Sequence, residues 1–216
     1  EKYLHEALAL FRAANHPTAV SHMILTFGHL QWGWGELKAA TTSLREAAER
    51  FKGTDEEARH QAFQALAAIN LLQGNYAKAG HLLDRCAVYY RQLPHTHLWS
   101  TYIIQNYGEL ATATGRFADA ERYFSEALEQ FERIGKAWQN QLVGYLTPGV
   151  LLRLQGKLAE SENYLENALI TARRIGWQQM EPFVLHHLSR VQVEKGEFHA
   201  GLHLAEEALS VSNSIR

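Results

Sequence analysis

The amino-acid sequence predicts an all-α protein, a right-handed α-solenoid of about five antiparallel helix pairs. The first observation is a repeat, because small and large apolar residues recur at helical spacing around a series of glycines. The second is the period, since the glycines follow one another at intervals of 39, 41, 41 and 40 residues. Self-similarity at such a period is typical of solenoids, in which each repeat packs only against its neighbours. The glycines are Gly35, Gly74, Gly115, Gly156 and Gly196.

The segment after each glycine predicts one helix. Large apolar residues stand two positions after the glycine and, in most repeats, nine positions after it, while most residues at the fifth and twelfth positions are small. These steps approximate whole helical turns, so the four positions lie close to one face. The small residues are expected to let two helix backbones approach closely. At the fifth position they are Ala40, Ala79, Ala120, Ser161 and Gly201.

The segment before each glycine predicts a second helix. A residue that is large in four of the five repeats stands eight positions before the glycine, and a small residue follows it. The glycine is expected to end this helix in the left-handed conformation, because it lacks the Cβ that penalises positive φ. Each repeat is therefore a first helix, a tight glycine turn and a second helix. The small residues are Gly28, Ala67, Gly108, Gly149 and Ser189.

The repeat resembles the tetratricopeptide repeat (TPR), which carries a glycine at the turn, an aromatic residue just after it, and alternating small and aromatic residues down the second helix. Gly115, Phe117, Ala120, Phe124 and Ala127 match that pattern residue by residue. The resemblance covers about five repeats, nearly the whole chain, and implies a TPR-like superhelix.

The sequence departs from the family pattern in two ways. The period is close to 40 residues, whereas the family's usual period is about 34. The proline expected at the end of the second helix is missing, and its place is taken by Lys52, Arg91, Glu132, Arg173 and Asn213. Longer repeats of this kind are similar to those of bacterial ATP-dependent LuxR-type transcription activators and of related signalling proteins.

The pattern predicts a single repeat array over residues 1–216. Residues 1–14 form a partial leading helix, which favours a fragment of a larger protein. Thr54 to Glu57 is a capping-box pattern that opens a first helix. Pro148 falls inside another, so we expect a kink or local break between Gly144 and Gly149. The expected repeats are 17–53, 54–94, 95–135, 136–176 and 177–216.

Composition excludes several classes of function. The net charge is −2 and Lys and Arg do not cluster, so we expect no direct nucleic-acid binding. No apolar run approaches the roughly 20 residues of a membrane span. The single cysteine, Cys86, occupies a small-residue packing position and is expected to be a buried thiol, which fits a reducing, cytoplasmic setting.

Catalytic and metal-binding patterns are also missing. The sequence has no nucleophile elbow, P-loop, dinucleotide fingerprint or HExxH motif. His199 and His203 have a spacing that two metal ligands can share, but no Cys, Asp or Glu in the pattern completes a site, which favours solvated histidines. We therefore expect no enzyme activity, no cofactor and no metal.

The resemblance implies that the first helices line a concave surface. Residues 13, 10, 6 and 3 positions before each glycine would face it. Aromatic, amide and guanidinium groups there suit a peptide, a protein segment or a small polar ligand; alternatively, several of them pack against the next repeat. The predicted ligand- or partner-binding residues are His22, His29, Trp32, Gln61, Gln64, Tyr102, Gln105, Glu109, Arg153, Phe183, His186 and Arg190.

One binding mode of the family is not expected. TPR domains that bind chaperone tails hold a C-terminal carboxylate with Lys and Asn on first helices, and the corresponding positions here do not carry that pair. They hold Leu25 and His29, Gln64 and Ala68, or Gln105 and Glu109.

Two functions remain. The first is a non-catalytic sensor or interaction domain of a multidomain bacterial signalling protein, a transcription regulator, that binds through its concave face and contacts other domains of the parent protein. The alternative is a passive protein–protein interaction scaffold or self-assembly module, because apolar surface at the terminal helices would favour self-association.

Overall fold

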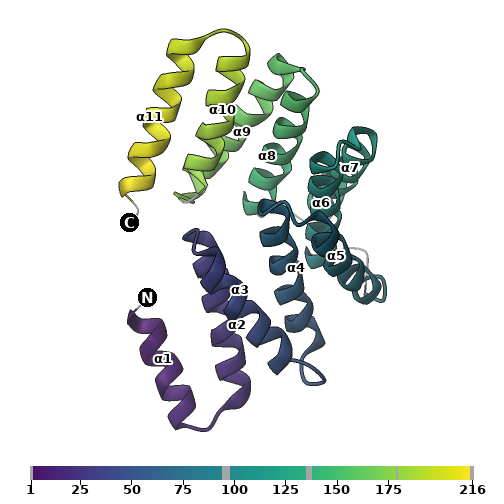
Figure 1. Ribbon diagram of the computed structural model, residues 1–216, viewed down its shortest axis with the longest axis vertical. Coiled ribbons are helices and arrows are strands. Elements are labelled where there is room, and N and C mark those ends of the chain that lie inside the picture. Colours follow the sequence, from purple (N-terminus) through teal and green to yellow (C-terminus); the bar gives the residue numbers. More distant parts are fainter. Residues whose placement is uncertain (1, 94–97, 135–137, 179, 215–216) are drawn as a thin grey trace. The chain divides into compact units, whose positions relative to one another are not determined.

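The structure is a computed structural model that describes residues 2–93, 98–134, 138–178 and 180–214. The chain divides into two compact units, Glu1–Pro94 and His95–Arg216. The described residues of both units form α-helices joined by short turns (Figure 1). None of these helices combines the length and the apolar character that a membrane span requires.

The described residues of the first unit form a leading helix and two helix pairs. The leading helix α1 (Lys2–Ala13) packs against α2 (Pro17–Gly33), which pairs with α3 (Leu37–Arg50). The second pair is α4 (Glu56–Leu72) with α5 (Tyr76–Tyr90), and α3 packs against α4.

In the second unit, the part of the chain that the structure describes forms three helix pairs. They are α6 (Leu98–Ala113) with α7 (Phe117–Ile134), α8 (Trp138–Leu154) with α9 (Leu158–Ile175), and α10 (Glu181–Glu194) with α11 (Phe198–Ser214). The second helix of one pair packs against the first helix of the next, α7 against α8 and α9 against α10. The predicted fold class is confirmed: the protein is all-α and TPR-like, with helix pairs as its repeating element.

Glycine ends the first helix of each pair, as expected. Gly115 has a φ of 74°, and the four equivalent glycines have φ between 75° and 86°. Residues other than glycine rarely adopt this backbone conformation, because their Cβ would then clash with the backbone. The turn at Gly115 is closed by two bonds, from its own N–H to the Thr112 carbonyl (3.1 Å) and from the Arg116 N–H to the Ala111 carbonyl (2.8 Å).

Small residues lie where the two helices of a pair cross. Ala40, Ala79, Ala120 and Ser161 are fully buried, which fits the close approach expected from their size. Where one member of the crossing is a serine, its hydroxyl joins the helices. The Ser161 hydroxyl donates to the Gly149 carbonyl at 2.6 Å, and the Ser189 hydroxyl donates to the Gly201 carbonyl at 2.7 Å.

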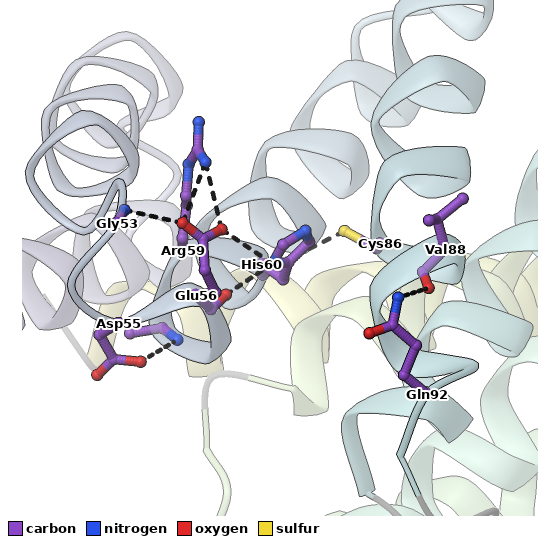
Figure 2. A network of polar contacts seen from close by, with 9 residues as sticks. Gly53, Asp55, Glu56, Arg59, His60, Cys86, Val88 and Gln92 are labelled. Carbon is purple, nitrogen blue, oxygen red and sulfur yellow. Dashed lines mark hydrogen bonds and ion pairs between the residues drawn. The ribbon is translucent and has the colours of Figure 1, made fainter.

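The predicted capping box at Thr54 is wrong by one residue. The N-cap of α4 is Asp55, whose carboxylate accepts a bond from the Ala58 N–H at 3.0 Å (Figure 2). Glu56 Oε1 accepts from the Gly53 N–H at 2.9 Å. A carboxylate at the N-cap also compensates the positive end of the helix dipole, which the Thr54 hydroxyl would not do. That hydroxyl donates instead to the Arg50 carbonyl.

Of the kink or local break expected between Gly144 and Gly149, the break does not occur, because α8 continues through Pro148. Proline removes one backbone bond, and α8 remains helical because it packs on both sides, against α7 and α9. Gly144, Thr147 and Pro148 line a cavity of about 10 Å³ together with Phe124 and Phe131 of α7. This volume holds about one water molecule, so this cavity beside Pro148 is too small for a larger ligand.

Candidate binding surface

The twelve predicted residues lie on the first helices of the five pairs. Those of the first unit are His22, His29 and Trp32 on α2 and Gln61 and Gln64 on α4. Those of the second unit are Tyr102, Gln105 and Glu109 on α6, Arg153 on α8, and Phe183, His186 and Arg190 on α10.

In the first unit, the α2 residues have separate surroundings. The His22 ring lies over Phe51, with centroids 4.8 Å apart, and its Nε2 is 3.3 Å from Asp55 Oδ2. His29 is half-buried, and burial lowers its pKa although its ring hydrogen-bonds to the Leu25 backbone, which acts in the opposite direction. His22 therefore belongs to the junction between α3 and α4.

The glutamines of α4 do not join this group. Gln64 is buried, and Gln61 is half-buried with its amide nitrogen 3.5 Å from Glu57 Oε1. Within the described part of the first unit, no hydrogen bond or ring contact links either glutamine to His22, His29 or Trp32. The described contacts of these residues in the first unit are thus with other neighbours, Phe51 and Asp55 for His22 and Glu57 for Gln61.

A network that the sequence did not reveal lies at the start of α4 (Figure 2). The His60 ring stacks on Tyr89 of α5 with centroids 4.2 Å apart, and its Nδ1 is 2.6 Å from the Glu56 carbonyl oxygen. The buried Cys86 thiol contacts the His60 carbonyl oxygen at 3.5 Å. The Gly53 N–H, followed by Arg59, lowers the pKa of the Glu56 carboxyl. These contacts join α4 to α5 and the preceding turn, so the network stabilises the fold.

The second unit brings Gln105 and Glu109 together in a group that we call the α6 cluster: Gln105, Asn106, Glu109 and Thr147. The Gln105 amide nitrogen lies 3.1 Å from Glu109 Oε1 and 3.2 Å from the Thr147 hydroxyl of α8. Burial raises the pKa of Glu109 to about 7, and the bond from Gln105 opposes the rise. No cation pairs with this carboxylate among the residues that the structure describes.

The α6 cluster has unused polar atoms. Gln105 Oε1 and Asn106 Nδ2 are buried and have no hydrogen-bond partner in the described structure. Buried polar atoms without a partner are uncommon in proteins and call for an explanation. Tyr102 does not share these surroundings, since its ring packs edge-on against Phe131 of α7, with centroids 5.4 Å apart.

The second group is the α10 cluster: Arg153, His186, His187, Arg190 and Glu194. The Arg153 guanidinium is almost wholly buried and forms an ion pair with Glu194. Burial, then the charges of Arg190 and Arg153, lower the pKa of His186. Burial, then His186 and both arginines, lower the pKa of His187 to about 4. The predicted residues Arg153, His186 and Arg190 therefore lie close enough to share one positive field.

The exposed part of the α10 cluster continues into an aromatic residue. His186 and Arg190 are exposed, and Arg190 makes no ion pair within the described residues. Phe183, three residues before His186, has 54% of its surface exposed. Residues at these helical spacings share one face, so α10 presents an aromatic ring, an imidazole and a guanidinium together.

Four cluster members were not predicted from the sequence. Asn106, Thr147 and His187 stand nine positions before their glycines, and Glu194 stands two positions before its glycine. Each is a direct neighbour of a position that the pattern did select. Their polarity was visible in the sequence, and a wider stripe on each first helix would have included them. The described residues contain no group of three or more potential metal ligands.

The chain is similar to known proteins in its repeat. Residues 58–137 match the tetratricopeptide repeat family model. No curated protein matches the sequence.

Solved structures resemble the fold. BtubC (BKLC) from P. vanneervenii has a TM-score of 0.63 and 19% identity, covering 99% of this chain and 90% of its own. A thermophilic TPR protein of Thermus thermophilus has a TM-score of 0.60 and 18% identity, covering 88% and 90%. Aspartyl phosphate phosphatase F from Bacillus subtilis has a TM-score of 0.65 and 11% identity, covering 95% and 55%. Together with the family match, these likenesses support a TPR domain, and the similarity to LuxR-type repeats stays a prediction.

Proposed function

We propose that this chain is a non-catalytic binding domain that takes up a polypeptide segment on the first helices of its repeats. In this proposal it serves as the sensor of a larger bacterial signalling protein in the cytoplasm, a transcription regulator. TPR folds generally mediate protein–protein interaction, which supports the binding role. The observation that carries the proposal is the exposed face of α10, where Phe183, His186 and Arg190 lie together.

Two physical arguments support this face as an interface. Aromatic residues and arginine are enriched in interfaces and dominate their binding energies, because they offer a large contact area with a polar end. Perturbed pKa values also gather at functional sites, and on α10 burial and neighbouring charges lower the pKa values of His186 and His187.

In a sensor, ligand binding must change the conformation or the contacts of the domain. A partner that binds one conformation of the repeats more tightly than another shifts the equilibrium between them. We propose that this shift alters contacts with other domains of the parent protein, which would transmit the signal.

The test is a thermal-shift screen of the whole chain against sugars, nucleotides, amino acids and pooled short peptides. A ligand at 100 times its dissociation constant adds about 2.7 kcal/mol to stability, so we expect a higher melting temperature with a peptide pool. Arg190→Gln should abolish the shift, and Arg116→Gln, in the turn before α7, should retain it. A screen in which only a sugar or nucleotide is active would replace the peptide role with small-molecule sensing.

A second function, self-association as a scaffold, has its own observation. Phe198, Leu202 and Leu209 on α11 are 67%, 58% and 63% exposed, and exposed apolar stripes often mark association sites. Light scattering that rises with concentration, and falls to the monomer value for Leu202→Glu but not for Ile170→Glu on α9, would support it. A monomer at every concentration would exclude it.

A further inference from the structure

The three first helices of the second unit carry different chemistry at the same position in the repeat. Six residues before the turn glycine stand Glu109 on α6, Val150 on α8 and Arg190 on α10. Equivalent positions on successive first helices form a row across the repeats. The row therefore runs from an acid through an apolar residue to a base.

At the acidic end of the row, none of the described residues supplies a counter-charge. Glu109 is partly exposed, its single described hydrogen bond comes from Gln105, and burial has removed part of its hydration. A carboxylate in such surroundings gains more from a cation than one in water does, because the interaction is less screened. A lysine or arginine side chain of a ligand would supply this cation.

The basic end is the exposed part of the α10 cluster. The charge of Arg153 is compensated by Glu194, whereas Arg190 is exposed and has no ion pair within the described residues. Its planar guanidinium can bind a carboxylate through two parallel hydrogen bonds. His186, one turn away on the same face, adds a further polar contact.

The centre of the row is apolar. Val150 and Leu146, one turn apart on α8, are partly buried and pack against the core formed by α9 and α10. Neither carries a charge, so this part of the surface offers contact with an apolar side chain.

The spacing of the helices sets the length of the ligand. The Gln105–Thr147 bond joins α6 to α8, and α8 contacts α10. With about 10 Å for each of these two steps, the distance typical of helices in contact, the row spans roughly 20 Å. An extended chain advances about 3.4 Å per residue, and roughly six residues bridge that span. A single amino acid or a small metabolite is too short to reach both charged ends.

We propose that the second unit binds an extended polypeptide segment in one orientation, with a basic side chain on Glu109, an apolar side chain on Val150 and Leu146, and an acidic side chain on Arg190. The inference rests on the proposed function, which it makes specific by naming the order of charges in the partner.

The experiment is selection of random dodecapeptides displayed on phage against the immobilised full chain. Selected peptides should carry Lys or Arg about six positions from Asp or Glu, with an apolar residue between them and one charge order prevailing. Selection on Glu109→Gln should lose the basic preference alone, and selection on Arg190→Gln should lose the acidic preference alone. Glu160→Gln and Arg116→Gln are the matched controls and should select the wild-type pattern.

Affinities of the consensus peptide complete the test. Fluorescence anisotropy should show roughly tenfold weaker binding to Glu109→Gln and to Arg190→Gln. Replacing the peptide's basic residue with norleucine should weaken binding to the wild type and leave binding to Glu109→Gln unchanged. Circular dichroism melts establish that each variant is folded.

The outcomes separate the two proposals. Strong binders without a fixed order of charges would overturn the inference and leave the proposed function standing. Selection that yields no binding peptide at all would overturn both.

Discussion

Gly108 and Phe124 touch where α6 crosses α7, and the contact leaves no room for a methyl group. A Cβ placed on Gly108 would lie 2.2 Å from Cε1 of the Phe124 ring. That ring is itself only 3% exposed, so it is held by its neighbours. The absence of a side chain at Gly108 is thus what allows a phenylalanine at the crossing.

Gly108→Ala is expected to lower the free energy of unfolding by roughly 1–3 kcal/mol, the usual effect of an extra methyl group in a packed core. Urea denaturation followed by circular dichroism measures this. Gly33→Ala is the matched control, because nothing lies within 4 Å of a Cβ at Gly33, and its stability should not fall. The double variant Gly108→Ala/Phe124→Leu should be more stable than Gly108→Ala alone, because the smaller side chain leaves room for the methyl group. If Gly108→Ala alone is as stable as the wild type, the Phe124 ring moves aside.

Substitutions of Arg153 and Glu194, which form an ion pair, should have non-additive effects on the free energy of unfolding. The Arg153 side chain is 5% exposed and that of Glu194 is 37% exposed, so Glu194→Gln leaves a buried charge without its partner. We expect a loss of roughly 1–3 kcal/mol, below the full effect of breaking a buried pair because Glu194 is partly solvated. Arg153→Met combined with Glu194→Gln should be more stable than Glu194→Gln alone. Equal stability of the two variants would show that the guanidinium is hydrated.

The Cys86 thiol should be unreactive in the folded protein. Burial raises the pKa of its thiol to about 12, and the thiolate is the reactive form. A thiol-specific disulfide reagent at neutral pH is expected to label the native chain far more slowly than the urea-unfolded chain. Labelling at equal rates would show that α5 opens frequently.

The sequence predicted the helix pairs well because each one repeats the same local physics. The turn at position 115 requires a positive φ and therefore a glycine, and the buried crossing at position 120 requires a small residue. Both requirements can be recognised from single residues in the sequence. The errors at Thr54 and Pro148 have a different origin. At Thr54 two neighbouring residues competed for one cap, and at Pro148 packing against α7 and α9 kept α8 intact.

The candidate site was less predictable, because its properties arise between repeats. Spacing alone placed Gln105 and Glu109 on one face, but the bond from Gln105 to Thr147 depends on how α6 meets α8. The partner of Arg153 was missed for the same reason, since Glu194 lies 41 residues away on another helix. Tyr102 has the spacing of a residue on the expected concave surface, but its ring packs against Phe131 of α7.

Glu109 should make stability depend on pH in a direction opposite to that of a salt-bridged acid. Its pKa in the folded chain is about 7, above its ordinary value of 4.5, so the folded state binds the proton more tightly than the unfolded state. The stabilisation from this proton is complete below the ordinary value and is lost as the pH rises from 4.5 through about 7. Above that window the ionised carboxylate destabilises the fold.

Glu109→Gln replaces the acid with a neutral side chain of similar shape. At about pH 8 the variant should be more stable than the wild type by roughly 1–3 kcal/mol, and at about pH 4 the two should be equally stable. Urea denaturation across this range measures the difference, with the exposed Glu160→Gln as the control that should track the wild type. A constant difference at every pH would mean that Glu109 keeps an ordinary pKa. A bound lysine side chain would stabilise the carboxylate, so saturation with a basic peptide should shrink the difference at high pH.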